Sequence, residues 1–135
     1  MNNARWIFCS LAMVTVLFVA AACSNDATGG GKQAGTLTVR LTTPNADDGA
    51  MTFQVSGAPI DSARAVNQSL RLFTRVDGGG VVGVVVGALA NGAVITLHVP
   101  DVGEAARYTA TVLEVADRQD ALRGSLAGYA LTVNR

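Results

Sequence analysis

Apolar and polar residues alternate along the chain from about position 36, with a period of two rather than the 3.6 of an amphipathic helix. Residues 37–41 read Leu-Thr-Val-Arg-Leu, and residues 51–55 read Met-Thr-Phe-Gln-Val. This alternation is typical of strands with one face on a core and the other in water. The segment 43–49, Thr-Pro-Asn-Ala-Asp-Asp-Gly, has the composition of a turn. The pattern predicts antiparallel strands on either side of it.

The spacing is less regular over the next segment. One or two strands are expected within residues 63–76, with Leu70, Leu72 and Phe73 as core positions. A short helix over residues 61–66 is the alternative for its beginning.

Residues 78–100 contain no Asp, Glu, Lys or Arg. A transmembrane helix and a pair of buried strands both fit such a run, but its valines and the Asn-Gly pair favour strands. Asn-Gly between two β-branched runs predicts a hairpin of residues 81–89 with 94–99. Gly-Gly-Gly-Val-Val-Gly at 78–83 matches the dinucleotide-binding fingerprint, yet β-branched sequence follows it where a helix is required. A glycine turn, followed by a bulge or a close strand approach at Gly83, is expected instead.

Two further strands are expected at residues 108–115 and 129–133, with a polar stretch between them. The total is seven to nine short strands in about 100 residues, which is enough chain for one core and too little for two. The predicted fold class is all-β, an antiparallel immunoglobulin-like β-sandwich over residues 36–135.

The first 23 residues have a different pattern. Arg5 and the amino terminus form a basic start, residues 6–22 are uncharged and mostly apolar, and three alanines precede Cys23. These features are typical of a secretory signal peptide, and the run is shorter than the roughly 20 apolar residues of a transmembrane helix. Ala20-Ala21-Ala22-Cys23 resembles the lipobox of bacterial lipoproteins, with Ala20 where that family usually has Leu.

The lipoprotein resemblance implies that residues 1–22 are a cleaved signal peptide and that Cys23 is the lipidation site. Ser24 stands where Asp commonly marks inner-membrane retention, so the resemblance implies an anchor in the outer membrane. Each buried methylene contributes ~0.8 kcal/mol, and an anchor of two or three acyl chains holds firmly where one chain binds only marginally. An ordinary secretory signal with a free Cys23 thiol and an uncleaved anchor helix are the alternatives.

After the cysteine, residues 24–35 contain four glycines and almost no apolar bulk. Together with Cys23 they are expected to form a flexible tether, residues 23–35, with a root-mean-square reach of roughly 20 Å.

The charge balance and the cysteine content limit which partners and cross-links are expected. Without residues 1–22, nine Lys and Arg face ten Asp and Glu, and such a balance gives no electrostatic reason to expect nucleic acid. Cys9 leaves with the signal peptide and Cys23 is acylated, so no disulfide is expected.

Candidate catalytic and metal-binding residues are few. An acid-base or nucleophilic site needs at least two converging groups, whereas His98 is the only histidine and is expected on the outer side of its strand. Calcium is bound by loop oxygens, but Asn-Ala-Asp-Asp-Gly is also a turn sequence, and calcium stays an open alternative. We expect no catalytic residue, metal site or cofactor. The loop carboxylates occur as Asp47 with Asp48, Asp101 with Glu104, and Asp117 with Asp120.

The number and position of the aromatic residues bear on whether the ligand is a sugar. Beyond Cys23 there is no Trp, and at least three of the four aromatic residues fall in core-like strand phase, which argues against a sugar-stacking surface. An exposed pair with Tyr108 or Tyr129 would favour sugar, and a cleft with two carboxylates about 5–10 Å apart would favour a hydrolase. The four are Phe53, Phe73, Tyr108 and Tyr129.

Residues 81–86 and 92–99, the latter reading Gly-Ala-Val-Ile-Thr-Leu-His-Val, resemble paired strands of cohesin-like and carbohydrate-binding-module-like β-sandwiches. This resemblance implies a partner bound through one sheet face and assigns no binding residue. The expected function is a lipid-anchored, non-enzymatic binding module of the bacterial cell envelope, attached to the membrane at Cys23, with an envelope protein or polysaccharide as partner. A carbohydrate-binding module on the same fold is the alternative, and a hydrolase is a third.

Overall fold

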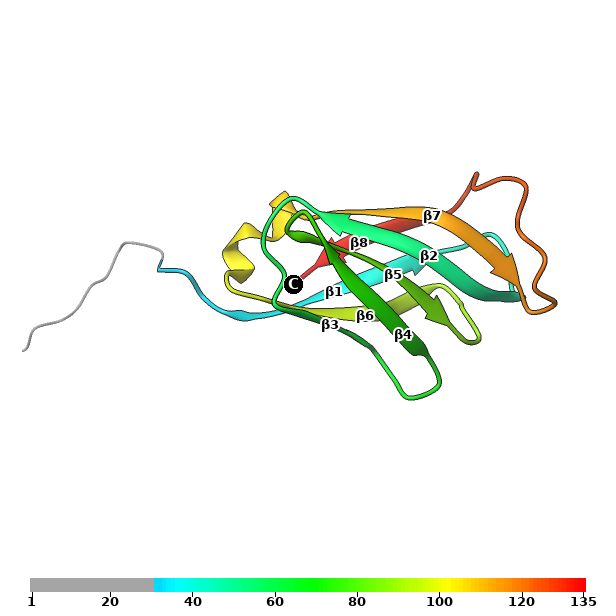
Figure 1. Ribbon diagram of the computed structural model, residues 1–135, viewed down its shortest axis with the longest axis horizontal. Helices are drawn as coiled ribbons and strands as arrows, with labels where there is room; N and C mark the ends of the chain where they lie inside the picture. Colours follow the sequence, from blue (N-terminus) through cyan, green and yellow to red (C-terminus); the bar gives the residue numbers. More distant parts are fainter. Residues whose placement is uncertain (1–30) are drawn as a thin grey trace, which may run out of the picture.

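Two four-stranded antiparallel sheets packed face to face make up the protein in a computed structural model that describes residues 31–135 (Figure 1). The strand order is β3-β6-β1-β8 in one sheet, here sheet A, and β4-β5-β2-β7 in the other, sheet B. The predicted all-β sandwich is therefore confirmed. The signal peptide predicted at residues 1–22 and the lipidation site at Cys23 lie outside the described residues.

Successive strands lie in different sheets, except that β4 and β5 are consecutive strands of sheet B. Sheet A contains β1 (Gly35–Thr42), β3 (Ser62–Ala65), β6 (Gly92–Val99) and β8 (Ala130–Asn134). Sheet B contains β2 (Asp48–Ser56), β4 (Arg71–Asp77), β5 (Gly80–Val86) and β7 (Thr109–Asp117).

A short 3-10 helix, η1 (Val102–Arg107), links β6 to β7. Asp101 caps it by accepting a hydrogen bond from the Gly103 amide at 2.8 Å. Within residues 31–135, no helix is both long enough and apolar enough to cross a membrane.

The core lies between the sheets and consists of the alternate residues that the period of two assigns to inner faces. Their exposed fraction is 2 % or less on the two central strands β1 and β2. Burying each such side chain contributes roughly 1.5–3 kcal/mol. These residues are Leu37, Val39 and Leu41 on β1, and Met51, Phe53 and Val55 on β2.

The hairpin predicted around Asn91-Gly92 is wrong. β5 belongs to sheet B and β6 to sheet A, so the connection between them crosses the sandwich. Asn91 accepts a hydrogen bond from the Thr43 amide at 2.7 Å, and Gly92 has a φ of 136°. Asn-Gly chemistry specifies a turn, but it does not decide whether the strands on either side pair.

The tight hairpin lies instead at Gly78-Gly79, between β4 and β5. Both glycines have positive φ, 58° and 90°, as a type I′ turn requires. A strand follows, so the predicted glycine turn is confirmed. At Gly83 a Cβ atom would lie 2.7 Å from the carbonyl oxygen of Phe73, which confirms the predicted close approach.

Phe73 is 63 % exposed, and its predicted core position is wrong. Leu72 pairs with Val85 and takes the inward phase, so its neighbour Phe73 must point outward. Leu70 is buried as predicted. The alternative helix at residues 61–66 is also wrong, because β3 occupies that segment.

Gly57 provides a test of the packing between β2 and η1. Its φ is 113°, and a Cβ atom there would lie 1.8 Å from the carbonyl oxygen of Arg107. We expect Gly57→Ala to lower the free energy of unfolding by about 3 kcal/mol, through backbone strain and displacement of η1. Urea unfolding followed by circular dichroism measures this change.

Gly124→Ala is the matched control, because nothing lies within 4 Å of a Cβ atom there. Its unfolding free energy should change by less than about 0.5 kcal/mol. Equal losses in the two variants would contradict the assigned role of Gly57.

Candidate functional site

The outer face of sheet A is polar. The outward positions of its central strands are Thr, Arg and His residues, apart from Ala93, which pairs with Arg40. His98 is among them, exposed as predicted, with its Nδ1 3.5 Å from Thr36 Oγ1. The polar residues of this set on β1 and β6 are Thr36, Thr38, Arg40, Thr42, Thr96 and His98.

The outer face of sheet B has a different chemistry, because valine and alanine occupy many of its outward positions. The strand register aligns the outward residues in three rows that run from β4 across β5 and β2 to β7. We call this set the sheet B outer face. The rows are Arg71-Val86-Ala50-Ala116, Phe73-Val84-Thr52-Glu114 and Arg75-Val82-Gln54-Thr111.

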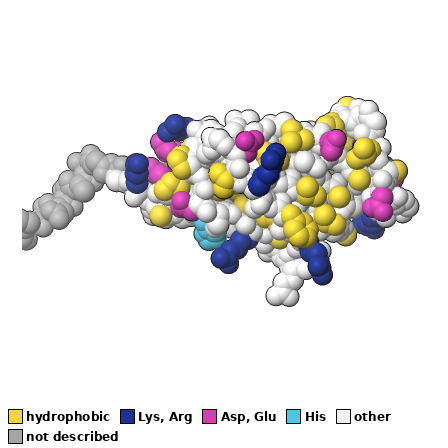
Figure 2. Space-filling model, viewed as in Figure 1, with side chains coloured by type: hydrophobic (Ala, Val, Ile, Leu, Met, Phe, Trp, Pro, Cys, Tyr) yellow, Lys and Arg dark blue, Asp and Glu magenta, His cyan; other side chains and the backbone are white. Residues whose placement is uncertain are grey.

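A shallow hollow of about 280 Å³ lies on this face, over β4 and β5. Its lining includes Phe73, Val82 and Val84, with Arg75 and Thr52 at its sides. Figure 2 shows hydrophobic side chains spread over the visible side of the molecule with basic side chains among them. Exposed apolar surface bordered by polar residues marks interaction sites in soluble proteins.

The predicted aromatic residues fall on different sides of the molecule. Tyr108 is 7 % exposed and donates its hydroxyl to the carbonyl oxygen of Pro59 at 2.6 Å. Burial, with Glu104 and Asp61 nearby, raises its pKa. Tyr129 is partly buried and packs against the core. Neither tyrosine forms an exposed pair, and within residues 31–135 Phe73 is the aromatic side chain that is exposed.

Sequence reasoning missed Phe73 as a surface residue, although a signal was present. Arg71 and Arg75 lie two residues to either side of it and share its side of the strand. Arginine is rarely buried, so their phase points Phe73 to solvent. The neighbouring Leu72 points toward the core instead.

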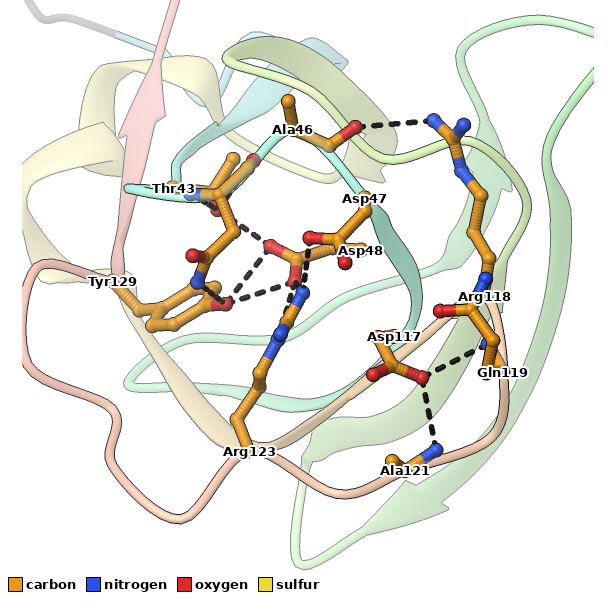
Figure 3. Close-up of polar contacts among 11 residues, drawn as sticks. Thr43, Ala46, Asp47, Asp48, Asp117, Arg118, Gln119, Ala121, Arg123 and Tyr129 are labelled. Carbon is orange, nitrogen blue, oxygen red and sulfur yellow. Dashed lines mark hydrogen bonds and ion pairs between the residues drawn. The ribbon is translucent and has the colours of Figure 1, made fainter.

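The predicted carboxylate pair Asp47 and Asp48 belongs to a hydrogen-bonded cluster at the start of β2 (Figure 3). Asp48 is fully buried. Its carboxylate accepts hydrogen bonds from Thr43 Oγ1 at 2.5 Å, from the Tyr129 hydroxyl at 2.9 Å and from Arg123 Nε at 3.0 Å. Three donors thus compensate the burial of one charge.

Opposing effects act on the pKa of Asp48. Burial alone raises it, but the hydrogen bonds from Thr43, Tyr129 and Arg123 and the charge of Arg123 outweigh burial and lower the pKa below its usual value. The hydrogen bond to Asp48 raises the pKa of Arg123 in turn. The pair is therefore ionised and fixed.

The second carboxylate of the pair is bound to the same cation, since Arg123 Nη2 also donates to Asp47. Asp117 accepts at Oδ1 from the amides of Gln119 and Ala121, at 2.9 and 3.0 Å, and so shapes the loop that follows β7. These carboxylates hold the loops of this end together. Their donors come from the protein itself.

The third carboxylate pair, Asp101 and Glu104, lies at η1. Asp101 caps this helix, and Glu104 forms an ion pair with Arg107. In the part of the chain that the structure describes, no three His, Cys, Asp or Glu side chains are grouped to hold a metal ion.

Comparison with known proteins gives no match to a family model, a curated protein or a solved structure. The sheet B outer face is therefore interpreted from its residues and geometry, and the cohesin-like resemblance stays a prediction.

The Asp48 cluster predicts a pH-dependent contribution to stability. We expect Asp48→Asn to lower the free energy of unfolding by about 3 kcal/mol at neutral pH, because it removes the buried carboxylate charge to which Thr43, Tyr129 and Arg123 donate. The folded pKa of Asp48 is lowered, so its contribution is complete above the unfolded value of about 3.9 and is lost as the pH falls through the folded value. The difference between wild type and variant should shrink below about pH 4 in urea unfolding.

Asp120→Asn is the control, because Asp120 is exposed and asparagine tolerates its positive φ of 65°. Its stability should stay within about 0.5 kcal/mol of wild type. A loss for Asp48→Asn that is the same at every pH would contradict the role of the ionised carboxylate.

Proposed function

We propose that this chain is a lipid-anchored, non-enzymatic binding protein of the bacterial cell envelope, and that it binds a protein partner through the sheet B outer face. The observation that carries the proposal is the contrast between the two outer faces. The same architecture presents Thr, Arg and His on sheet A and a valine-rich surface with an exposed Phe73 on sheet B.

A lipid anchor at Cys23 would leave the sheet B outer face accessible. The amide of Val102 donates to the carbonyl oxygen of Gln33 at 2.8 Å, so the segment before β1 is attached beside η1. Figure 1 shows this segment leaving from the η1 end of the sandwich, with both sheets extending away from it. A lipid on Cys23 would hold the domain by that end and leave the sheet B outer face free along the side.

The composition of the face favours a protein ligand over a sugar. Protein interfaces combine an apolar centre with aromatic and arginine side chains, and Phe73 lies between Arg71 and Arg75 with Val82 and Val84 beside it. A surface that binds sugars by aromatic stacking needs more than one exposed aromatic side chain. Tyr108 and Tyr129 are both engaged in internal hydrogen bonds.

The contacts of the acidic residues favour binding over hydrolysis. Asp47 and Asp48 are the closest match to a carboxylate pair, and both are bonded to Arg123. A general acid requires a raised pKa, whereas the pKa of Asp48 is lowered.

The anchor is tested by substitution of the proposed lipidation site. Cys23→Ala should release the protein from the membrane fraction, since it removes the thiol that takes the lipid. Cys9→Ser is the control and should stay membrane-bound, because residue 9 lies within the segment expected to be removed. Fractionation and mass spectrometry of the mature protein measure both. A Cys23→Ala protein that is still processed and membrane-bound would disprove the anchor.

The binding face is tested with two lysine substitutions at outward positions of central strands. Val84→Lys on sheet B should reduce capture of an envelope protein by the full chain at least tenfold, because it places a charge in the apolar centre. Thr96→Lys on sheet A should leave capture unchanged. Quantitative pull-down from envelope extract gives the comparison. Equal capture by the two variants, or capture of polysaccharide alone, would refute the proposed interface.

A further inference from the structure

A sandwich of two open sheets has four edge strands, and three of them are short or covered. β3 has four residues and β8 has five. β7 is longer, but its ladder with β2 contains register shifts, and the segment after it folds back along its end, where Arg123 donates its amide to the Val115 carbonyl at 2.8 Å. Short strands, irregular ladders and covering loops prevent edges from pairing.

β4 differs from these edges. It has seven residues, Arg-Leu-Phe-Thr-Arg-Val-Asp, and its ladder with β5 has no register shift. It contains neither Lys nor Pro; its charged residues are Arg71, Arg75 and Asp77, which would block an edge unless the partner strand offers groups that complement them. Within residues 31–135, the backbone hydrogen bonds outside the ladders occur in turns, loops and caps, and none of them involves β4. One side of this strand is therefore open for a further strand.

Two large apolar side chains of β4 are also exposed to solvent, one on each side of the sheet. Val76 has the inward phase, since it pairs with the buried Val81, and yet it is 77 % exposed. On the other side of the strand Phe73 is 63 % exposed. An additional strand beside β4 would cover both residues.

The sequence of β4 is complementary to itself in antiparallel orientation. A two-fold axis through Thr74 places Arg71 opposite Asp77 of a second copy, Leu72 opposite Val76, and Phe73 opposite Arg75. Every such pair joins two residues of the same phase, so inward positions meet inward positions. The outermost pair is a salt bridge, the next is apolar, and the third is a cation–π contact, each favourable across strands.

We propose that β4 is a self-association edge through which two copies of this chain pair antiparallel about Thr74, joining their B sheets into one continuous sheet. Leu72 and Val76 of the two copies then cover each other on the inner side. The two sheet B outer faces become neighbours, with Phe73 near the junction. The pairing rests on the edge of β4 and does not depend on the anchor or on the envelope partner.

Disulfide trapping in the full chain tests the register. Thr74→Cys places two cysteines opposite each other on the axis, where strand geometry brings Cα atoms to about 4.5–5.5 Å and permits a disulfide. Arg71→Cys places the two cysteines roughly 20 Å apart along the strand. We expect a dimer on non-reducing gels for Thr74→Cys, and none above the background of the unsubstituted chain, with its native Cys9 and Cys23, for Arg71→Cys.

Co-expression of Arg71→Cys with Asp77→Cys should restore the dimer, because these positions are opposite in the proposed register. A Thr74→Cys chain that stays monomeric would overturn the proposal. Equal dimer bands for Thr74→Cys and Arg71→Cys would overturn it as well, since they would show random collision instead of pairing.

Charge reversal gives an independent readout on the same trapped dimer. Arg71→Asp in the Thr74→Cys chain sets two carboxylates opposite each other at both ends of the pair, so association should weaken roughly tenfold. The double change Arg71→Asp with Asp77→Arg reverses both partners and should restore trapping. A double variant as weak as the single one would contradict the pairing of these residues.

The failure of this proposal is distinguishable from failure of the proposed function. Val84 is on the central strand β5 and takes no part in the β4 pair. Val84→Lys should therefore leave Thr74→Cys trapping unchanged while it reduces capture of the envelope protein at least tenfold.

Discussion

The buried carboxylate of Asp48 is the interaction on which one end of the sandwich depends. It brings together the turn before β2, the loop after β7 and the residue before β8, which contribute Thr43, Arg123 and Tyr129. A buried charge is costly without donors, so these three segments must be in place together. The hydrogen bonds of Asp48 therefore reach across up to 81 residues of sequence and couple the positions of these segments.

The period of two sufficed to predict most strands, because each inner face has to be apolar and each outer face has to contact water. It could not predict which strands pair. Asn91-Gly92 has the residues of a hairpin turn but spans the two sheets, whereas Gly78-Gly79 makes the hairpin. Turn chemistry is local, and the choice between pairing and crossing is made by packing of the whole core.

The candidate surface was less predictable than the fold. Phe73 follows Leu72, and because successive side chains of a regular strand point to opposite faces, only one of the two can face the core. The flanking arginines decide the phase, but only once β4 is known to be a strand. The carboxylates were visible in the sequence as turn residues, but the cation bound to Asp48 was not, because Arg123 lies 75 residues from Asp48 in sequence.

The order of strands also has a consequence for folding. Apart from the β4–β5 hairpin, every ladder joins strands that are distant in the chain, and β1 is completed only by the last strand, β8. Topologies dominated by such non-local contacts fold slowly. β8 supplies the buried Leu131 and follows directly on Tyr129, a donor to Asp48, so without this segment sheet A would lack an edge strand and Asp48 one of its hydrogen bonds. Completion of sheet A and completion of the hydrogen bonds around Asp48 therefore depend on the same short segment.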